Sequence, residues 1–202
     1  MIDTDKEKEI ISRLHERIRN DGVVIGEDVL KVDTFLNHQI DPVFIMQLGQ
    51  ELGQRFAANG VTKILTVEAS GIAVAMAAGL ALNVPVLFAK KGRPSTLQGQ
   101  VYVAQVFSFT RQGETDIFVS AHFLSADDVV LIVDDFLAHG EALQGLISLA
   151  RQAGARIAGA GIVIEKSFQH GGDAPRQEGI RIESLAAIAS MRPGEIRFLS
   201  EG

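Results

Sequence analysis

The stretch VLIVDDFLAHGEA, residues 130–142, decides the fold of this chain. An apolar run over 129–133 leads directly into Asp134 and Asp135, and Gly140 then precedes an expected helix. A short apolar run without polar alternation is typical of a strand that is buried on both faces of a parallel sheet. Adjacent carboxylates repel each other, so their position at the end of such a strand calls for a reason.

Strands and helices alternate on both sides of this stretch. The expected strands are 62–67, 85–89, 129–133, 156–164 and 181–185, and the expected helices between them are 71–82 and 141–153. A β-hairpin is expected from 101–109 and 116–119, with Arg-Gln-Gly-Glu (111–114) as its turn. Apolar strands that alternate with helices predict an α/β fold with a mostly parallel sheet flanked by helices.

The first 60 residues predict a helical subregion within a single domain, 1–202. Apolar residues at helical spacing over 10–18 indicate a first helix, which Gly22 is expected to end. Asp41 followed by Pro42 is typical of an N-cap and the first helical position, and Gly60 is expected to end that second helix.

Composition excludes several classes of function. The 202 residues contain no cysteine, which rules out disulfides, zinc–thiolate sites and a cysteine nucleophile and is compatible with the cytoplasm. The net charge of −6 argues against a nucleic-acid-binding surface. The uncharged segment 69–89 is long enough to span a bilayer, but Asn83 and Pro85 interrupt it. A buried helix followed by a buried strand explains it better, so no membrane association is expected.

Polar residues follow three of the expected strands. Glu68–Gly71 follow the first strand, Asp134 and Asp135 follow the apolar run, and Glu165–Lys166 follow the next strand. Parallel strands end at the same edge of a sheet, and ligands bind outside these carboxyl ends. We therefore expect the three groups to converge on one site.

The residues after 133 favour a ligand that carries both hydroxyl groups and phosphate. Two carboxylates can accept hydrogen bonds from vicinal hydroxyls and attract hydrated Mg²⁺, whereas Gly140 at a helix N-terminus exposes amides that suit a phosphate. A solvated acidic loop with a helix cap is the alternative. The sequence contains neither G-x-x-x-x-G-K-[ST] nor G-x-G-x-x-G. Vicinal hydroxyls and a phosphate one turn apart describe ribose 5-phosphate.

This stretch resembles the 5-phosphoribosyl diphosphate (PRPP) signature of type I phosphoribosyltransferases. The resemblance implies that family's fold, with a β-hairpin hood over the active site. It also implies that Asp134 and Asp135 bind the ribose hydroxyls. Mg²⁺ is expected to bind together with PRPP, and the two aspartates are the only protein residues expected to be within its reach. The residues implied to bind PRPP form a phosphate loop, a pyrophosphate loop and a basic pair: Ala138, His139, Gly140, Glu141 and Ala142; Glu68, Ala69, Ser70 and Gly71; Lys90 and Lys91.

The chain departs from the family pattern in two places. His139 and Ala142 stand where many relatives have threonine, so backbone amides must carry more of the phosphate binding. A side chain at Gly140 is therefore expected to weaken PRPP binding much more than stability. Ser70 stands where adenine-specific relatives often have arginine. The cation for pyrophosphate must then come from Lys90, Lys91 or Arg93, or from a neighbouring subunit.

Four segments, 30–42, 66–73, 133–142 and 161–169, resemble more narrowly the bacterial xanthine-specific group of the family. This resemblance implies transfer of phosphoribosyl to N9 of xanthine in purine salvage, by a cytoplasmic homodimer. It implies Leu30, Asn37 and Lys166 as xanthine-binding residues, although asparagine is also a common turn residue. Phe136 is expected either beside the substrate or in the core.

Two other functions remain open from the residues alone. Adenine and guanine phosphoribosyltransferases share the PRPP-binding residues and differ in the base. A PRPP-sensing transcription regulator would need an added DNA-binding domain, for which only the short segment before Asp21 remains.

Overall fold

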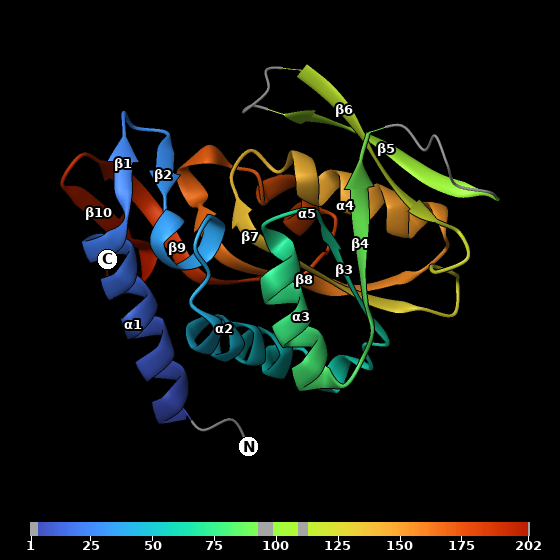
Figure 1. Cartoon of the computed structure of the whole chain (residues 1–202), viewed down its shortest axis with the longest axis horizontal. Coiled ribbons are helices and arrows are strands. Elements are labelled where there is room, and N and C mark those ends of the chain that lie inside the picture. The colour runs from blue at the N-terminus through green and yellow to red at the C-terminus, as the bar shows by residue number, and fades with distance from the viewer. Residues whose placement is uncertain (1–3, 93–98, 109–112, 202) are drawn as a thin grey trace.

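The computed structural model describes residues 4–92, 99–108 and 113–201, which form one eight-stranded sheet, a two-stranded ribbon and flanking helices (Figure 1). The order of strands across the large sheet is β10-β9-β8-β7-β3-β4-β6-β5. Its strands are β3 (Lys63–Val67), β4 (Val86–Lys91), β5 (Val101–Ser108), β6 (Gly113–Ser120), β7 (Val129–Leu137), β8 (Arg156–Lys166), β9 (Ile182–Arg192) and β10 (Glu195–Phe198).

The five central strands of the sheet are parallel. β9, β8, β7, β3 and β4 run in one direction, with Ile64 of β3 opposite Leu131 of β7 and Leu131 opposite Gly159 of β8. β10 pairs antiparallel with β9 at one edge, and the β5–β6 hairpin pairs antiparallel with β4 at the other. The predicted α/β fold with a mostly parallel sheet and a hairpin is confirmed.

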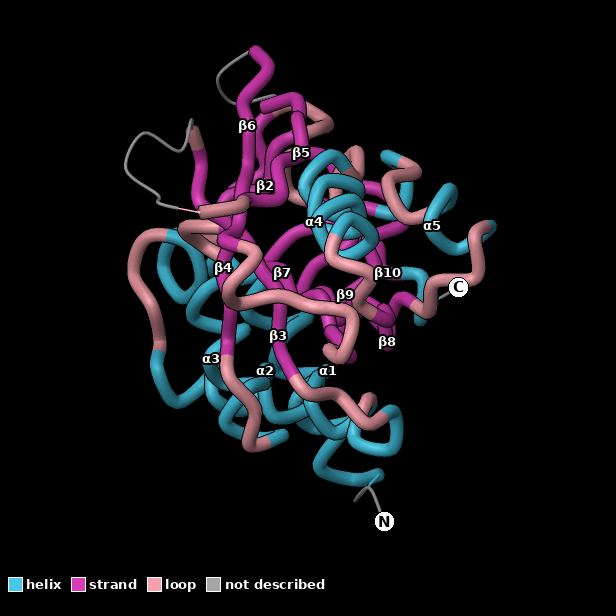
Figure 2. Tube along the Cα trace, turned by 90° about the vertical axis from the view of Figure 1, so that its right-hand side faces the viewer, coloured by secondary structure: helices cyan, strands magenta, loops and turns pink. Residues whose placement is uncertain are grey.

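Helices cover both faces of the sheet (Figure 2). α1 (Thr4–Asp21), α2 (Pro42–Arg55) and α3 (Gly71–Leu82) share one hydrophobic core with the sheet, and α4 (Glu141–Gln152) packs into the other. The short helix α5 (Asp173–Gln177) follows β8. The Asp41 carboxylate accepts a hydrogen bond from the Phe44 amide, so Asp41 is the N-cap that the sequence predicts.

Several element boundaries differ from the sequence-based expectation. β6 begins at Gly113 rather than at residue 116, so two residues of the expected 111–114 turn belong to the strand, and β8 continues past residue 164 to Lys166. α2 ends at Arg55 rather than at Gly60, because a 3₁₀ turn over Ala57–Asn59 intervenes before Gly60 adopts a left-handed φ of 67°. β7 does not end at residue 133 but continues to Leu137, because β8 stays paired with it and places Ile162 opposite Asp134 and Ile164 opposite Phe136. β9 is likewise longer than 181–185, because β8 and β10 flank it.

The N-terminal subregion is less helical than predicted. Between α1 and α2 lie β1 (Val23–Ile25) and β2 (Val29–Lys31), an antiparallel ribbon, followed by a π-helical turn over Asp33–Asn37. Strands of three residues are too short to produce a readable alternation of apolar and polar positions.

Segment 69–89 forms α3 and most of β4, as predicted, but the helix is not buried all round. Met76 and Leu80 on its outer face are 62% and 69% exposed. Among the residues that the structure describes, no helix is both long and apolar enough to cross a bilayer.

Candidate functional site

The acidic pair lies at the carboxyl end of β7 and is buried there. Asp134 and Asp135 are 7% and 5% exposed. The Asp135 amide donates to Asp134 Oδ1 at 3.0 Å, and the Ser70 hydroxyl donates to Asp135 Oδ1 at 2.9 Å. Ser70 comes from the loop after β3, so the structure brings two of the three predicted strand ends into direct contact.

Burial disfavours the charged form of Asp134. Desolvation raises its pKa well above the ordinary aspartate value, the adjacent Asp135 carboxylate raises it further, and the Lys91 ammonium partly opposes both effects. The charged form of a carboxyl group buried in this way is unfavourable, and hydrogen bonds from bound hydroxyl groups or a nearby cation can stabilise it. Perturbed acids of this kind are typical of functional sites.

Replacing Asp134 with asparagine is expected to stabilise the protein at neutral and alkaline pH. Because the folded-state pKa of Asp134 lies above the unfolded-state value, its stabilising contribution is complete below the unfolded pKa and is lost as pH rises through the folded pKa. Asparagine stays neutral and can still accept the bond from the Asp135 amide. Thermal unfolding should show a gain on the order of 1 kcal/mol at about pH 8 and a smaller one at about pH 5. An equal gain at both pH values would contradict this assignment.

Gly71 leaves no room for a side chain beside the acidic pair. A Cβ at this position would lie 2.4 Å from Thr66 Oγ1 and 2.6 Å from Asp134 Oδ1. Thr66 is fully buried, and its hydroxyl has no hydrogen-bond partner among the described residues. Sequence reasoning missed Thr66, although a hydroxyl within the otherwise apolar strand 64–67 was a readable signal.

The predicted phosphate loop lines a cavity of about 230 Å³ beneath the β5–β6 hairpin. Gly140 is the N-cap of α4 with φ +88°, a left-handed conformation that favours glycine. The cavity is lined by the whole loop together with Lys91, Phe136 and apolar residues of the hairpin. These residues are Ala138, His139, Gly140, Glu141, Ala142, Lys91, Phe136, Val106, Phe107 and Ile117, among others.

Gly140 also packs against a second segment of backbone. A Cβ at Gly140 would lie 2.4 Å from the Gly171 carbonyl oxygen. A substituted residue would need a strained φ and would displace Gly171. The sequence analysis expects a side chain here to weaken PRPP binding much more than stability, and the structure adds a reason for the free energy of unfolding to fall as well.

The pyrophosphate-loop residues 68–71 join β3 to α3. The Glu68 carboxylate accepts a hydrogen bond from the Lys91 amide at 2.7 Å, which ties this loop to the end of β4. The peptide bond between Glu68 and Ala69 is cis. Ala69 is exposed and Ser70 is half-buried, so the loop presents backbone next to the acidic pair.

The two lysines of the basic pair do not play equivalent structural parts. Lys91 lines the phosphate-loop cavity, and its positive charge lowers the pKa of Asp134. Successive side chains of a strand point to opposite faces, so the Lys90 side chain points away from the cavity. That both lysines meet pyrophosphate stays a prediction, and of the two only Lys91 lines this cavity. Arg93, the other candidate, lies outside the described residues.

Lys91→Ala is expected to raise the PRPP KM by about tenfold, because a charge-assisted hydrogen bond contributes roughly 1.5–3 kcal/mol. Lys90→Ala, a substitution of the same kind at the neighbouring position, should have a clearly smaller effect. Steady-state kinetics with PRPP varied at saturating base measures both. Equal effects of the two substitutions would show that the direction of the side chains along β4 does not decide which lysine binds PRPP.

Lys166, at the end of β8, contacts the N-terminal ribbon. Its ammonium donates to the Asp28 carbonyl at 2.7 Å in the β1–β2 turn, close in sequence to Leu30, and burial lowers its pKa. Leu30 itself is buried in β2. Asn37 is exposed at the end of the π-helical turn, and within the described part of the chain no hydrogen bond joins it to Lys166 or Leu30. The structure thus brings the ribbon and Lys166 together.

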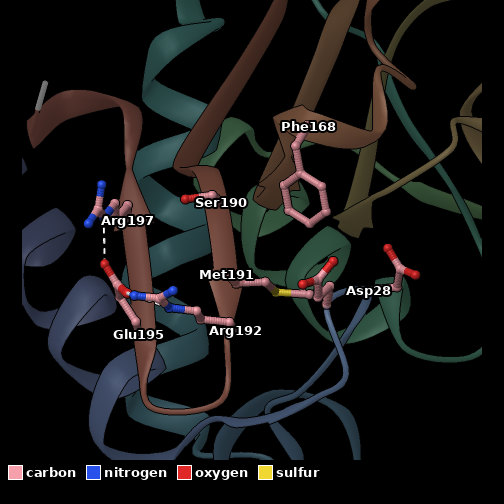
Figure 3. A pocket seen from close by; sticks show the side chains of 8 residues that line it. Asp28, Phe168, Ser190, Met191, Arg192, Glu195 and Arg197 are labelled. Atoms are coloured by element: carbon pink, nitrogen blue, oxygen red, sulfur yellow. Dashed lines mark hydrogen bonds and ion pairs between the residues drawn. The ribbon is translucent and has the colours of Figure 1, made fainter.

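A second cavity, of about 420 Å³, lies between the β1–β2 turn, the turn after β8 and the β9–β10 hairpin (Figure 3). Phe168 and Asp28 face it from one side, and Met191 faces it from the other. Arg192 and Arg197 both bond to the Glu195 carboxylate, and these bonds lower its pKa. Glu195, together with the other acidic side chains that line the cavity, offsets the positive charge of the two arginines, so the cavity has no excess positive charge for a phosphate.

Residues 42–179 match the sequence profile of the phosphoribosyl transferase domain, which is more than half of the chain. The chain belongs to the phosphoribosyltransferase family. This phosphoribosyltransferase is 64% identical over 93% of its length to the whole of a protein from Heliobacterium modesticaldum named xanthine phosphoribosyltransferase. It is 55% identical over 95% of its length to 97% of the Moorella thermoacetica protein of the same name.

Solved structures confirm the fold of this phosphoribosyltransferase. The Giardia lamblia adenine phosphoribosyltransferase, solved with 9-deazaadenine, superposes with a TM-score of 0.73 at 21% identity, over 88% of this chain and 97% of that one. The Trypanosoma brucei enzyme, solved with AMP, pyrophosphate and ribose-5-phosphate, gives 0.72 at 16% identity, over 86% of this chain and 79% of that one. At these identities the likeness establishes the type I phosphoribosyltransferase fold and nothing about the base.

Proposed function

We propose that this pentosyltransferase acts in purine salvage and transfers the 5-phosphoribosyl group of PRPP to N9 of xanthine, giving xanthosine 5′-phosphate and pyrophosphate. The observation that carries the PRPP part is the arrangement of the acidic pair, Ser70, Lys91 and the phosphate loop around the carboxyl ends of β3, β4 and β7. The names and high identity of the relatives support xanthine as the base.

The residues of the site supply positioning and charge. The loop 138–142 and the N-terminus of α4 bind the 5-phosphate through backbone amides, since the loop contains no serine or threonine. Asp134 and Asp135 accept hydrogen bonds from the two ribose hydroxyls. Positive charge builds on the ribose ring as pyrophosphate departs, and these carboxylates stabilise it. No side chain is required as a covalent nucleophile, because the N9 nitrogen of the base attacks C1 directly.

The residues present fit a Mg²⁺ ion only when PRPP accompanies it. Among the described residues, no three or more histidine, aspartate or glutamate side chains gather as a metal site. Asp134 and Asp135 each keep one carboxylate oxygen outside the bonds described above, and Mg²⁺ commonly binds through one or two carboxylates plus substrate phosphates. When bound, Mg²⁺ would neutralise charge on the pyrophosphate leaving group.

Turnover of the purified protein tests the proposal directly. Xanthine, guanine and adenine are each supplied with PRPP and Mg²⁺, and nucleotide and pyrophosphate are quantified. PRPP-dependent formation of xanthosine 5′-phosphate is the expected result. A protein that binds PRPP without turning over any purine base would instead favour a PRPP sensor.

We propose further that the enzyme acts in the cytoplasm as a homodimer and that residues 1–202 form one domain. The outer faces of α2 and α3, two helices that pack against each other, expose large apolar side chains: Val43, Met46, Met76 and Leu80. Exposed apolar surface of this kind is typical of subunit interfaces. Light scattering should give a mass about twice that of the 21.7 kDa chain.

A further inference from the structure

Glu165, at the carboxyl end of β8, is a buried carboxylate that the transfer reaction does not use. It is 4% exposed. Its two oxygens accept a bidentate pair of bonds from the Arg176 guanidinium at 2.8 and 2.7 Å, and the Ser184 hydroxyl donates to Oε2 at 2.5 Å. A buried carboxylate is costly unless it is paired and hydrogen-bonded in this way. Arg176 is therefore held in one orientation by Glu165.

Arg176 belongs to α5, and its guanidinium lies against the backbone that precedes this helix. A Cβ at Gly172 would lie 2.2 Å from Arg176 Nη1 and 3.0 Å from Glu165 Oε1. The Arg176 amide also donates to the Gly172 carbonyl at 3.1 Å. The ion pair thus fixes the turn over 170–172 as well as the short helix.

This turn lies directly against the phosphate loop. The Gly171 amide donates to the Ala138 carbonyl at 3.1 Å. A Cβ at Gly171 would lie 2.2 Å from the Ala138 carbonyl oxygen and 2.4 Å from the Gly140 amide nitrogen. Only glycine at position 171 permits this approach, and any movement of the turn must move the backbone of Gly140 or Ala138.

We propose that Glu165 and Arg176 form a positioning pair for the phosphate loop. Through the 170–172 turn, the pair holds the loop amides in the orientation that binds the 5-phosphate of PRPP. The inference rests on the proposed function in one respect, which is that loop 138–142 binds this phosphate. Neither residue needs to contact the substrate, and the effect is specific to the phosphate end of PRPP.

The bidentate geometry of the Glu165–Arg176 pair means that arginine and lysine at position 176 should behave differently. A bidentate arginine–carboxylate pair fixes a plane, whereas lysine offers a point charge on a flexible chain. Arg176→Lys should therefore keep the charge and most of the stability but hold the turn less firmly. Arg176 is the better position to vary, because Glu165 adjoins Lys166, which is assigned to the base.

The experiment measures binding of ribose 5-phosphate by calorimetry and the KM values for PRPP and xanthine. The proteins compared are the native chain, Arg176→Met, Arg176→Lys and Arg181→Met. Arg181 is a matched control, because it is similarly exposed and also bonds to a glutamate, Glu183, but it precedes β9 at the opposite end of the sheet. Thermal unfolding of each variant shows whether it is folded at the assay temperature.

Arg176→Met is expected to weaken ribose 5-phosphate binding and to raise the PRPP KM, each by about tenfold, since misplacement by a fraction of an ångström is costly at such sites. The xanthine KM should stay within about twofold of native. Arg176→Lys should fall between native and Arg176→Met, and Arg181→Met should bind ribose 5-phosphate as the native chain does. If Arg176→Met does not fold, Arg176→Lys carries the same comparison.

Two contrary results are distinguishable. If the native protein fails to bind ribose 5-phosphate, the phosphate-loop assignment fails, and the positioning role fails with it. If the native protein binds ribose 5-phosphate and the folded Arg176 variants bind it equally well, the positioning role alone is overturned. A parallel rise in the KM values for PRPP and xanthine would likewise overturn it, because that pattern indicates a general loss of structure.

Discussion

Asp134→Asn combined with Asp135→Asn is expected to give a folded protein that has lost most of its phosphoribosyl transfer. Asparagine can still accept the bonds from Ser70 and from the Asp135 amide, so local structure should persist. The negative charge that stabilises the developing positive charge on the ribose is removed. Loss of a strong electrostatic contact in the transition state costs about 2.7–4 kcal/mol, or roughly a 10²–10³-fold fall in kcat.

The chain offers a control pair at the other end of the same strand. Asp127 and Asp128 are also adjacent aspartates, and they precede β7 rather than ending it. Asp128 bonds to Lys63 and to the Ser125 amide, so Asp127→Asn with Asp128→Asn should lower the thermal midpoint and leave kcat close to native. Near-native turnover by the folded Asp134 and Asp135 double variant would end the assignment of these residues to ribose.

Adenine should be a negligible substrate, and Lys166→Ala should strongly depress the use of xanthine. Xanthine has an oxygen at C6, where adenine has an amino group. The Lys166 ammonium is a donor only, and it already bonds to a carbonyl oxygen, that of Asp28, which a xanthine oxygen can replace. A site built to bond a polar group can reject an analogue without it by roughly 10⁴-fold, because buried groups are left unpaired.

Measurement of kcat/KM for xanthine, guanine and adenine checks this order, with xanthine best and guanine weaker. Guanine shares the C6 oxygen and differs at C2, so a second residue must separate it from xanthine. Asn37, which is exposed in the structure, is the residue proposed to distinguish the two bases. Asn37→Ala should therefore lower the ratio of kcat/KM for xanthine to kcat/KM for guanine. Efficient turnover of adenine by the native protein would refute the base assignment and leave the PRPP site unaffected.

Local pattern was sufficient for most of the central sheet. The uncharged run after Ser70 predicted helix 71–82 to the residue, and Asp41 with Pro42 predicted the start of α2. Strand ends were harder. The acids at 134 and 135 suggested that the strand was over, but hydrogen bonds from β8 extend β7 through both of them. The ribbon of β1 and β2 was missed because three residues carry too little periodicity.

By itself, the sequence determined the fold class, the strand that carries the acidic pair and the position of the glycine-containing turn that leads into α4. These features follow from contiguous residues, because apolar runs, glycines and caps act over a few positions. Only the tertiary structure decided that Ser70 bonds Asp135, that Lys91 rather than Lys90 faces the cavity, and that Arg176 binds Glu165. Each of these depends on strand register and side-chain direction across the sheet, where a shift of one residue reverses the face.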